Sequence, residues 1–375
     1  MHFALTEEQR AIRDAAHAFL ASATSPERRT AALESNAGWD VDLWKALAAE
    51  LGFAGLMTPE MYGGSGLGAV EMSLVLEETG RVLASTPLFE TAVVAVTAIL
   101  GAGNEAQKAD LLPRLAAGAI IATPLQAREG DRAPRLTQAP ELLLEGVVRF
   151  APFGAAADLL IVECEGPGGA TLIALPATAS GVAVTAQACL DPTRPLANVA
   201  LTSVAVHPEW ILGEIGGAAA ALTYVETVAA GLLAAELTGV AAHSLASTVD
   251  YVQQREQYGR KIGSFQAVKH TLADMMVQVE AARSASLYAA AAIDLGGDEA
   301  VEAASIAKAW CGDAANHCAG EAIQLHGGIG FTWEHPAHLY FKRARSSSQW
   351  LGSPAFHRER VARLMGLDAA TPDPS

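Results

Sequence analysis

The stretch from Gly217 to about Tyr258 contains no proline and can form one helix of about forty residues, roughly 60 Å long at 1.5 Å per residue. Three more helical segments follow, at 264–295, 298–325 and 354–365, and Ser353-Pro354 is typical of a helix start. Long helices joined by short connections predict an antiparallel four-helix bundle. A helix of this length beside another domain is expected to have neighbours from a second subunit.

Two other kinds of segment precede the bundle. Residues 1–118 carry repeated helix signals, beginning with the capping box Thr6-Glu7-Glu8-Gln9. From 119 to 213, short apolar runs spaced about ten residues apart are separated by Gly, Pro and Asp turns, which predicts a small antiparallel β domain. The sequence therefore predicts an α+β protein with domains at 1–118, 119–213 and 214–368, and a frayed tail at 369–375.

The charge balance argues against polyanionic partners. Lys+Arg 25 against Asp+Glu 41 gives a net charge of −16, so we expect no nucleic acid and no anionic membrane surface as partner. The uncharged stretch 166–190 is long enough to span a membrane, but its prolines and glycines predict strands and turns. We expect a cytoplasmic protein whose four cysteines are free thiols, and the absence of any CxxC pair predicts no metal.

Two motifs carry the features of a dinucleotide site. In REQYG at 255–259, Arg255 offers a planar fork of donors suited to a pyrophosphate, Gln257 an amide, and Tyr258 a flat face for a ring. In QLHGGIGF at 324–331, Gln324 precedes Gly327-Gly328, where missing side chains let a ligand approach the backbone. Taken alone, Arg255 is better interpreted as a helix-end cation near carbonyl groups, whereas within this motif we interpret it as a ligand of the dinucleotide. His326 and His335 lack a third metal ligand, so we interpret them as loop-packing residues.

These motifs, their order and their separation resemble the acyl-CoA dehydrogenase family over nearly the whole chain. The segments YGGSGLG (62–68), ADLLIV (157–162) and LDPTRPLANVALTSVAV (190–206) also fit that family. The resemblance implies a helical domain, a middle antiparallel β domain and a C-terminal four-helix bundle, assembled as a homo- or hetero-tetramer. It also implies an FAD site that crosses a subunit interface. The residues it implies for FAD are Arg255, Gln257, Tyr258, Gln324, Gly327 and Gly328, with Phe265 and Gln266 as further candidates and Phe150 as the aromatic stacked on the flavin.

The family's chemistry is α,β-dehydrogenation of an acyl-CoA thioester. A carboxylate removes the α-proton, flavin N5 takes hydride from the β-carbon, and the electrons pass to an electron-transfer flavoprotein. The resemblance places the two usual positions of that carboxylate at Leu351, between Trp350 and Gly352, and at Ala229, twenty-six residues before Arg255. Neither side chain can accept a proton.

Two other carboxylates lie near Ala229 along the predicted helix. Glu236 follows it by two turns on the same face, about 10 Å along the axis, and Glu226 precedes it by about 4.5 Å. Both are candidate bases that would need a shifted substrate. The alternatives are a Glu236 that is a paired or capped helix carboxylate and a Glu226 that is solvated.

The middle domain also departs from the family. Its Thr-Glu-Pro segment falls at Ala122-Thr123-Pro124, the following residues keep none of the usual pattern, and Pro152 replaces a hydroxyl-bearing residue. Two interpretations follow. The chain is an acyl-CoA dehydrogenase with an unusual base, or it is a non-catalytic subunit that completes the FAD site of a sister subunit, as in family members that oxidise bulky, steroid-type or dicarboxylic acyl-CoAs. A third, an oxygen-using flavin enzyme of the same fold, has no specific support in the sequence.

Overall fold

The computed structural model describes residues 4–127, 130–138 and 141–367. Its contacts divide the chain into two compact units. The first, called the helical unit below, comprises the described parts of Met1–Ser22, Ala69–Leu83 and Ala229–Ser375. The second, the sheet unit, comprises Ala23–Gly68 and Ala84–Val228. The three consecutive domains expected from the sequence stay a prediction, and the predicted frayed tail lies outside the described residues.

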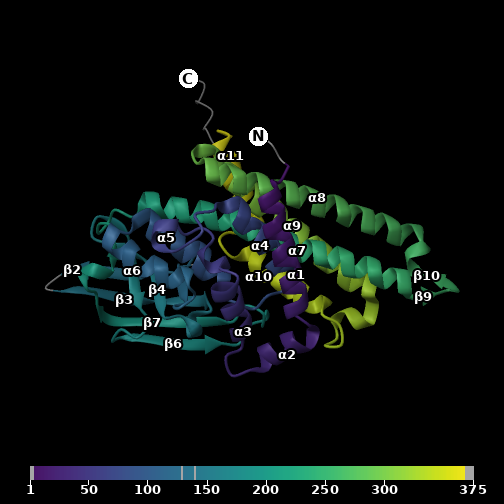
Figure 1. Ribbon diagram of the computed structural model, residues 1–375, viewed down its shortest axis with the longest axis horizontal. Helices are drawn as coiled ribbons and strands as arrows, with labels where there is room; N and C mark the ends of the chain where they lie inside the picture. Colours follow the sequence, from purple (N-terminus) through teal and green to yellow (C-terminus); the bar gives the residue numbers. More distant parts are fainter. Residues whose placement is uncertain (1–3, 128–129, 139–140, 368–375) are drawn as a thin grey trace, which may run out of the picture. The chain divides into compact units, whose positions relative to one another are not determined.

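The helical unit is built mainly from long helices (Figure 1). The long segments predicted from the sequence are confirmed with small shifts at their ends, and the reciprocal hydrogen bonds between Thr6 and Gln9 (3.0 and 3.1 Å) confirm the first capping box. The helix α10 was not predicted. The helices of this unit are α1 (Glu7–Ala23), α4 (Ala69–Val82), α7 (Ala219–Gln254, from residue 229 on), α8 (Gln266–Leu295), α9 (Asp298–His326), α10 (Ala337–Gln349) and α11 (Pro354–Leu364).

Small residues let two of these helices approach closely. A Cβ atom on Gly239 of α7 would lie 1.8 Å from the carbonyl oxygen of Glu77 on α4. A Cβ on Gly80 of α4 would lie 2.1 Å from the carbonyl oxygen of Glu236. Among the described residues α7 is also the helix that is long and apolar enough to cross a membrane, but 89% of its most apolar stretch is buried in the structure. That burial is typical of a core helix.

The sheet unit holds an eight-stranded sheet with strand order β6-β7-β3-β2-β4-β5-β8, in which β1 also pairs with β4. The apolar runs predicted as strands form β3 to β7. Most pairs are antiparallel as predicted, whereas β1 and β2 each run parallel to β4. The strands are β1 (Ala122–Leu125), β2 (Arg135–Gln138), β3 (Leu142–Pro152), β4 (Leu159–Gly166), β5 (Gly169–Pro176), β6 (Val182–Gln187), β7 (Leu196–Ala205) and β8 (Ile211–Leu212).

Successive side chains of β4 point to opposite faces of the sheet, and each face belongs to one of the two hydrophobic cores of the sheet unit. Leu159 and Ile161 pack on one face with helical residues and with the start of α7, whereas Leu160 and Val162 pack on the other face with other strands. The helices of this unit are α2 (Pro26–Glu34), α3 (Val41–Lys45), α5 (Val96–Ala102) and α6 (Glu105–Ala116), with π-helical turns at Ala46–Glu50 and Phe89–Ala95.

Candidate functional site

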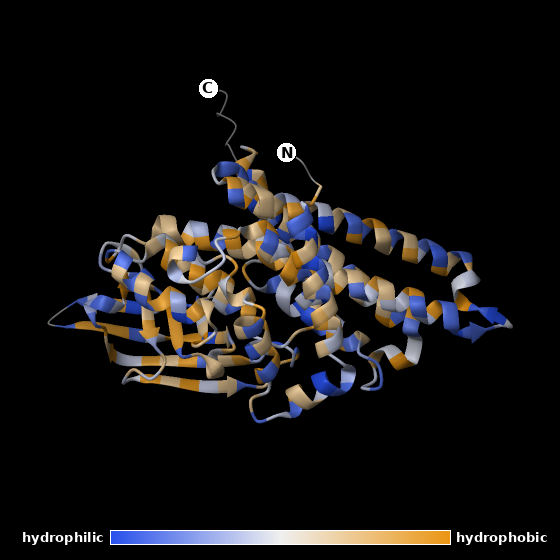
Figure 2. Cartoon of the chain, in the orientation of Figure 1, coloured by the Kyte–Doolittle hydropathy of each residue, from blue (hydrophilic) through white to orange (hydrophobic). Residues whose placement is uncertain are grey.

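The first sequence motif forms a two-stranded ribbon at the end of α7. Strands β9 (Glu256–Gln257) and β10 (Arg260–Lys261) pair antiparallel, and the intervening Tyr258 and Gly259 both have positive φ, 54° and 74°. Positive φ at both central residues is the geometry of a type I′ hairpin turn. The ribbon is hydrophilic (Figure 2), and Tyr258 is 93% exposed. The turn therefore exposes the aromatic ring of Tyr258 to solvent.

Arg255 immediately precedes this ribbon and is exposed. Its neighbour Glu256 pairs with Lys261 at 3.0 Å, and within the described residues the Arg255 guanidinium has no ion pair. The guanidinium of Arg260 instead lies over the ring of Phe265, 3.9 Å from its centre. The donors of Arg255 are consequently available to an external anion. Gln266, the first residue of α8, is also exposed.

The second motif forms the end of α9. Gly327 has φ 64° and caps the helix by donating its N–H to the carbonyl groups of Ile323 and Gln324. A Cβ on Gly328 would meet no atom within 4 Å, whereas one on Gly330 would lie 2.8 Å from the Ile323 carbonyl oxygen. The backbone is thus open to a ligand at Gly327-Gly328 and closely packed at Gly330.

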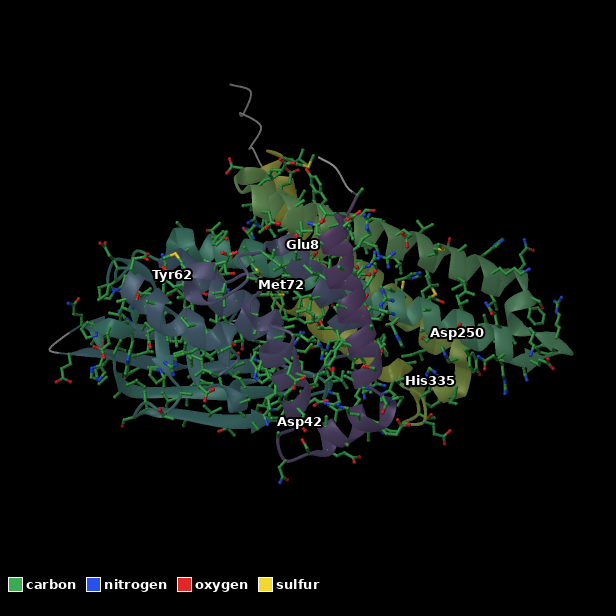
Figure 3. The ribbon with its side chains drawn as sticks, in the orientation of Figure 1. Glu8, Asp42, Tyr62, Met72, Asp250 and His335 are labelled. Carbon is green, nitrogen blue, oxygen red and sulfur yellow. The ribbon has the colours of Figure 1, made fainter. Side chains whose placement is uncertain are left out.

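The histidines of this loop pack against one another. The ring of His326 stacks on Tyr251 at 4.4 Å and lies tilted against the ring of His335 at 4.2 Å, and its Nδ1 lies 2.6 Å from the Ala322 carbonyl oxygen. Burial and the neighbouring imidazoles lower the pKa of His335 to about 4. Figure 3 labels His335 in the loop that leads to α10. No cluster of three or more His, Cys, Asp or Glu residues suited to a metal is present in the described part of the chain.

Neither position that the family resemblance gives for the base carries an acid, and the carboxylate of Glu236 is paired with other side chains. Ala229 is buried, and Leu351 is half-buried in a left-handed turn with φ 58°. Glu236 is 2% exposed; the Arg343 guanidinium contacts its Oε1 at 3.2 Å, and the Ser347 hydroxyl donates to the same atom at 3.0 Å. Glu236 is therefore a paired carboxylate within the helical unit.

The other candidate, Glu226, lies in the sheet unit near a second carboxylate. Glu163 continues the face of β4 that holds Leu159 and Ile161, against which Val225 of α7 packs. Burial raises the pKa of Glu163, the charge of Glu226 raises it further, and a hydrogen bond from Gln126 partly offsets both. Sequence reasoning missed Glu163, although a glutamate on the apolar side of an alternating strand was a usable signal.

Phe150 marks a distortion of β3. It has φ 60°, is 39% exposed, and lies in an irregular stretch of the pairing with β7, where its N–H donates to the Asn198 side chain at 3.1 Å. Nearby, the hydroxyl of buried Thr123 donates to the Pro152 carbonyl oxygen. Thr123 is therefore engaged with the protein backbone.

Known proteins match this chain over almost its whole length. The acyl-CoA dehydrogenase N-terminal domain matches residues 6–119 and the acyl-CoA dehydrogenase C-terminal domain matches residues 217–366. The chain belongs to the acyl-CoA dehydrogenase family. Acyl-CoA dehydrogenase IpdE2 of Mycolicibacterium smegmatis is 35% identical over 96% of this chain and 98% of its own.

Solved structures agree with this assignment. The ChsE4-ChsE5 complex from Mycobacterium tuberculosis matches with a TM-score of 0.91 and 27% identity, covering 100% of both chains. A variant of the Tcur3481-Tcur3483 steroid ACAD matches with a TM-score of 0.88 and 31% identity over 97% of this chain and 99% of that one. The family's fold is therefore confirmed, and its members are FAD-dependent flavoenzymes.

Proposed function

We propose that this chain is one of two unlike subunits of a heteromeric acyl-CoA dehydrogenase, and that it completes the FAD site of a sister subunit that carries the catalytic base. The single observation that carries this proposal is that the helical unit has no carboxylate at the usual positions of the catalytic base. Leu351 and Ala229 occupy the usual base positions, and the nearest carboxylate on the same helix within this unit, Glu236, is buried against Arg343. The names of two structural relatives, each a pair of differently named chains, support it.

The exposed ribbon and the open glycine pair fit one half of a dinucleotide site. Arg255 and Gln257 would hold the pyrophosphate by charge-assisted and amide hydrogen bonds, Tyr258 would cover a ring, and Gln324 would bind beside the backbone at Gly328. When bound, FAD accepts the hydride removed from the acyl chain. The protein residues named here only bind and orient it.

We further propose the substrate and assembly. An acyl-CoA with a bulky, steroid-type acyl group is supported by the relative whose name is a steroid ACAD, and an electron-transfer flavoprotein is the expected acceptor. The assembly would be a tetramer of two chain types. A cytoplasmic location is consistent with four cysteines that are all free thiols.

The test is the flavin content of the purified protein, measured from its visible absorption. The chain alone is expected to retain little flavin, and coexpression with a base-bearing acyl-CoA dehydrogenase chain from the same organism should yield a yellow complex. Near one flavin per chain in a homo-oligomer would contradict the proposal. In the complex, Arg255→Ala should lower flavin retention, whereas the control Arg358→Ala, at an exposed arginine paired with Asp313, should not. Unchanged flavin in Arg255→Ala would exclude that residue from the site.

A second candidate function rests on the carboxylate pair of the sheet unit. If the chain alone is a flavoprotein that oxidises an acyl-CoA, Glu226 is the base, and its charge raises the pKa of the neighbouring Glu163 carboxyl. In that case Glu226→Gln should abolish turnover with flavin still bound. Full turnover in Glu226→Gln would eliminate this candidate.

A further inference from the structure

The turn at Trp350–Gly352 joins α10 to α11 in an uncommon backbone conformation. Leu351 has φ 58° and Gly352 has φ 95°. A Cβ on Gly352 would lie 2.5 Å from the ring of Phe356 and 2.9 Å from His357 Nε2. A non-glycine residue with positive φ is held there only when its surroundings impose the conformation.

Lys308 of α9 holds this turn from one side. Its side chain is completely buried, and its Nζ donates to the carbonyl oxygens of Ser348 and Gly352, each at 3.0 Å. These two carbonyl groups lie on either side of Leu351. Asn316, two turns further along α9, donates to the Ser348 hydroxyl at 3.0 Å and fixes the same end of α10.

His357 of α11 holds the turn from the other side. It is buried, and its Nε2 lies 2.8 Å from the carbonyl oxygen of Leu351. Burial lowers the pKa of His357 to about 4, so the imidazole is neutral at pH 7. A carbonyl oxygen only accepts, and the tautomer with hydrogen on Nε2 is therefore assigned from this contact.

These bonds involve no side-chain atom of Leu351. Lys308 binds the carbonyl oxygens of residues 348 and 352, and His357 binds that of residue 351. Burying an ammonium group with carbonyl partners alone has a large desolvation cost, which a methionine of similar length would avoid. A methionine would instead leave the two carbonyl groups without their donor.

We propose that Lys308 and His357 are positioning residues that lock the Trp350–Gly352 turn through its backbone, so that residue 351 is held in one place whatever its side chain. The importance of that place rests on the proposed function, because position 351 is where a sister subunit would carry its base. This chain keeps the support for residue 351 and presents an apolar side chain on it. Replacing Leu351 by glutamate would then place a carboxylate at that position without rebuilding the turn.

Hydrogen exchange by mass spectrometry on the full chain tests the lock, using peptides that cover residues 346–357. Lys308→Met and His357→Leu should each raise exchange in this segment at least tenfold, while peptides from the sheet unit stay unchanged. His357→Gln keeps a donor near the position of Nε2 and should restore protection to within about twofold of the parent. Leu351→Glu should also stay within about twofold.

Three outcomes would overturn the proposal: unchanged protection in both Lys308→Met and His357→Leu, equal exchange in His357→Gln and His357→Leu, or a tenfold rise in Leu351→Glu. If Lys308→Met does not fold, the two His357 variants and Leu351→Glu still decide the question. No flavin or partner subunit enters the measurement. Its failure is therefore distinguishable from failure of the proposed function, which the flavin content decides.

Discussion

Replacing Glu236 by glutamine separates a structural role for this carboxylate from a catalytic one. The substitution preserves the size of the side chain and leaves an oxygen that can accept from Ser347. It removes the negative charge that faces the Arg343 guanidinium at 3.2 Å, where both side chains are at most 3% exposed. Removing one partner of a buried ion pair costs about 3–5 kcal/mol, because the other charge is left without compensation.

The expected decrease in the free energy of unfolding of Glu236→Gln is large enough to measure by urea unfolding. A loss of about 3–5 kcal/mol corresponds to a fall in Tm of roughly 6–20 °C for a domain of 150–250 residues. The double variant Glu236→Gln/Arg343→Met should recover much of this loss, since no uncompensated charge remains. The control is Glu280→Gln, which removes an exposed carboxylate three residues before its partner Arg283 and should change stability by less than about 1 kcal/mol.

One result would refute the reasoning. If Glu236→Gln keeps parental stability, binds flavin normally in the assembled enzyme and loses all turnover, then Glu236 is the base and its pairing with Arg343 is incidental. A Glu236→Gln protein that is strongly destabilised, and is rescued by Arg343→Met, supports the structural role. Rescue is the decisive comparison, because a lost base cannot be restored by removing an arginine.

Three further predictions concern stability. Burial lowers the pKa of Lys308 from 10.5 to about 7. Between these pH values the unfolded chain binds more protons than the folded chain, so the free energy of unfolding should rise with pH. Lys308→Met should flatten this rise, measured by urea unfolding at pH 7 and 9.5. The pKa of Glu163 is raised, so stability should fall as pH rises above its ordinary value of 4.5, and Glu163→Gln should remove that fall in melting curves at pH 5 and 8. Gly239→Ala should lower the free energy of unfolding by more than about 3 kcal/mol, because the added Cβ would meet the Glu77 backbone. At Gly320 an added Cβ would meet no atom within 4 Å, so Gly320→Ala should raise the free energy of unfolding by about 0.5–1 kcal/mol in the same assay.

Much of the local structure could be predicted because its causes are local. The capping box at Thr6 and Gln9, the start of α11 after Ser353, and the ends of α8 and α9 depend on residues within one turn of each other. The exposed motif residues stay predictions as FAD ligands, because they were chosen from the order and separation of two family motifs. Helix α10 was missed because its serine-rich second half lacks a regular apolar stripe.

The sequence by itself determined the long helices and strands β3 to β7, the family, and the absence of an acid at positions 229 and 351. Only the tertiary structure decided what the remaining charged groups do. Glu236 and Arg343 are 107 residues apart, and Lys308 reaches a turn more than forty positions away. The partners of these groups are set by how helices pack against one another. A buried charge must find its counterpart across the core, and no pattern confined to one helix specifies which residue that is.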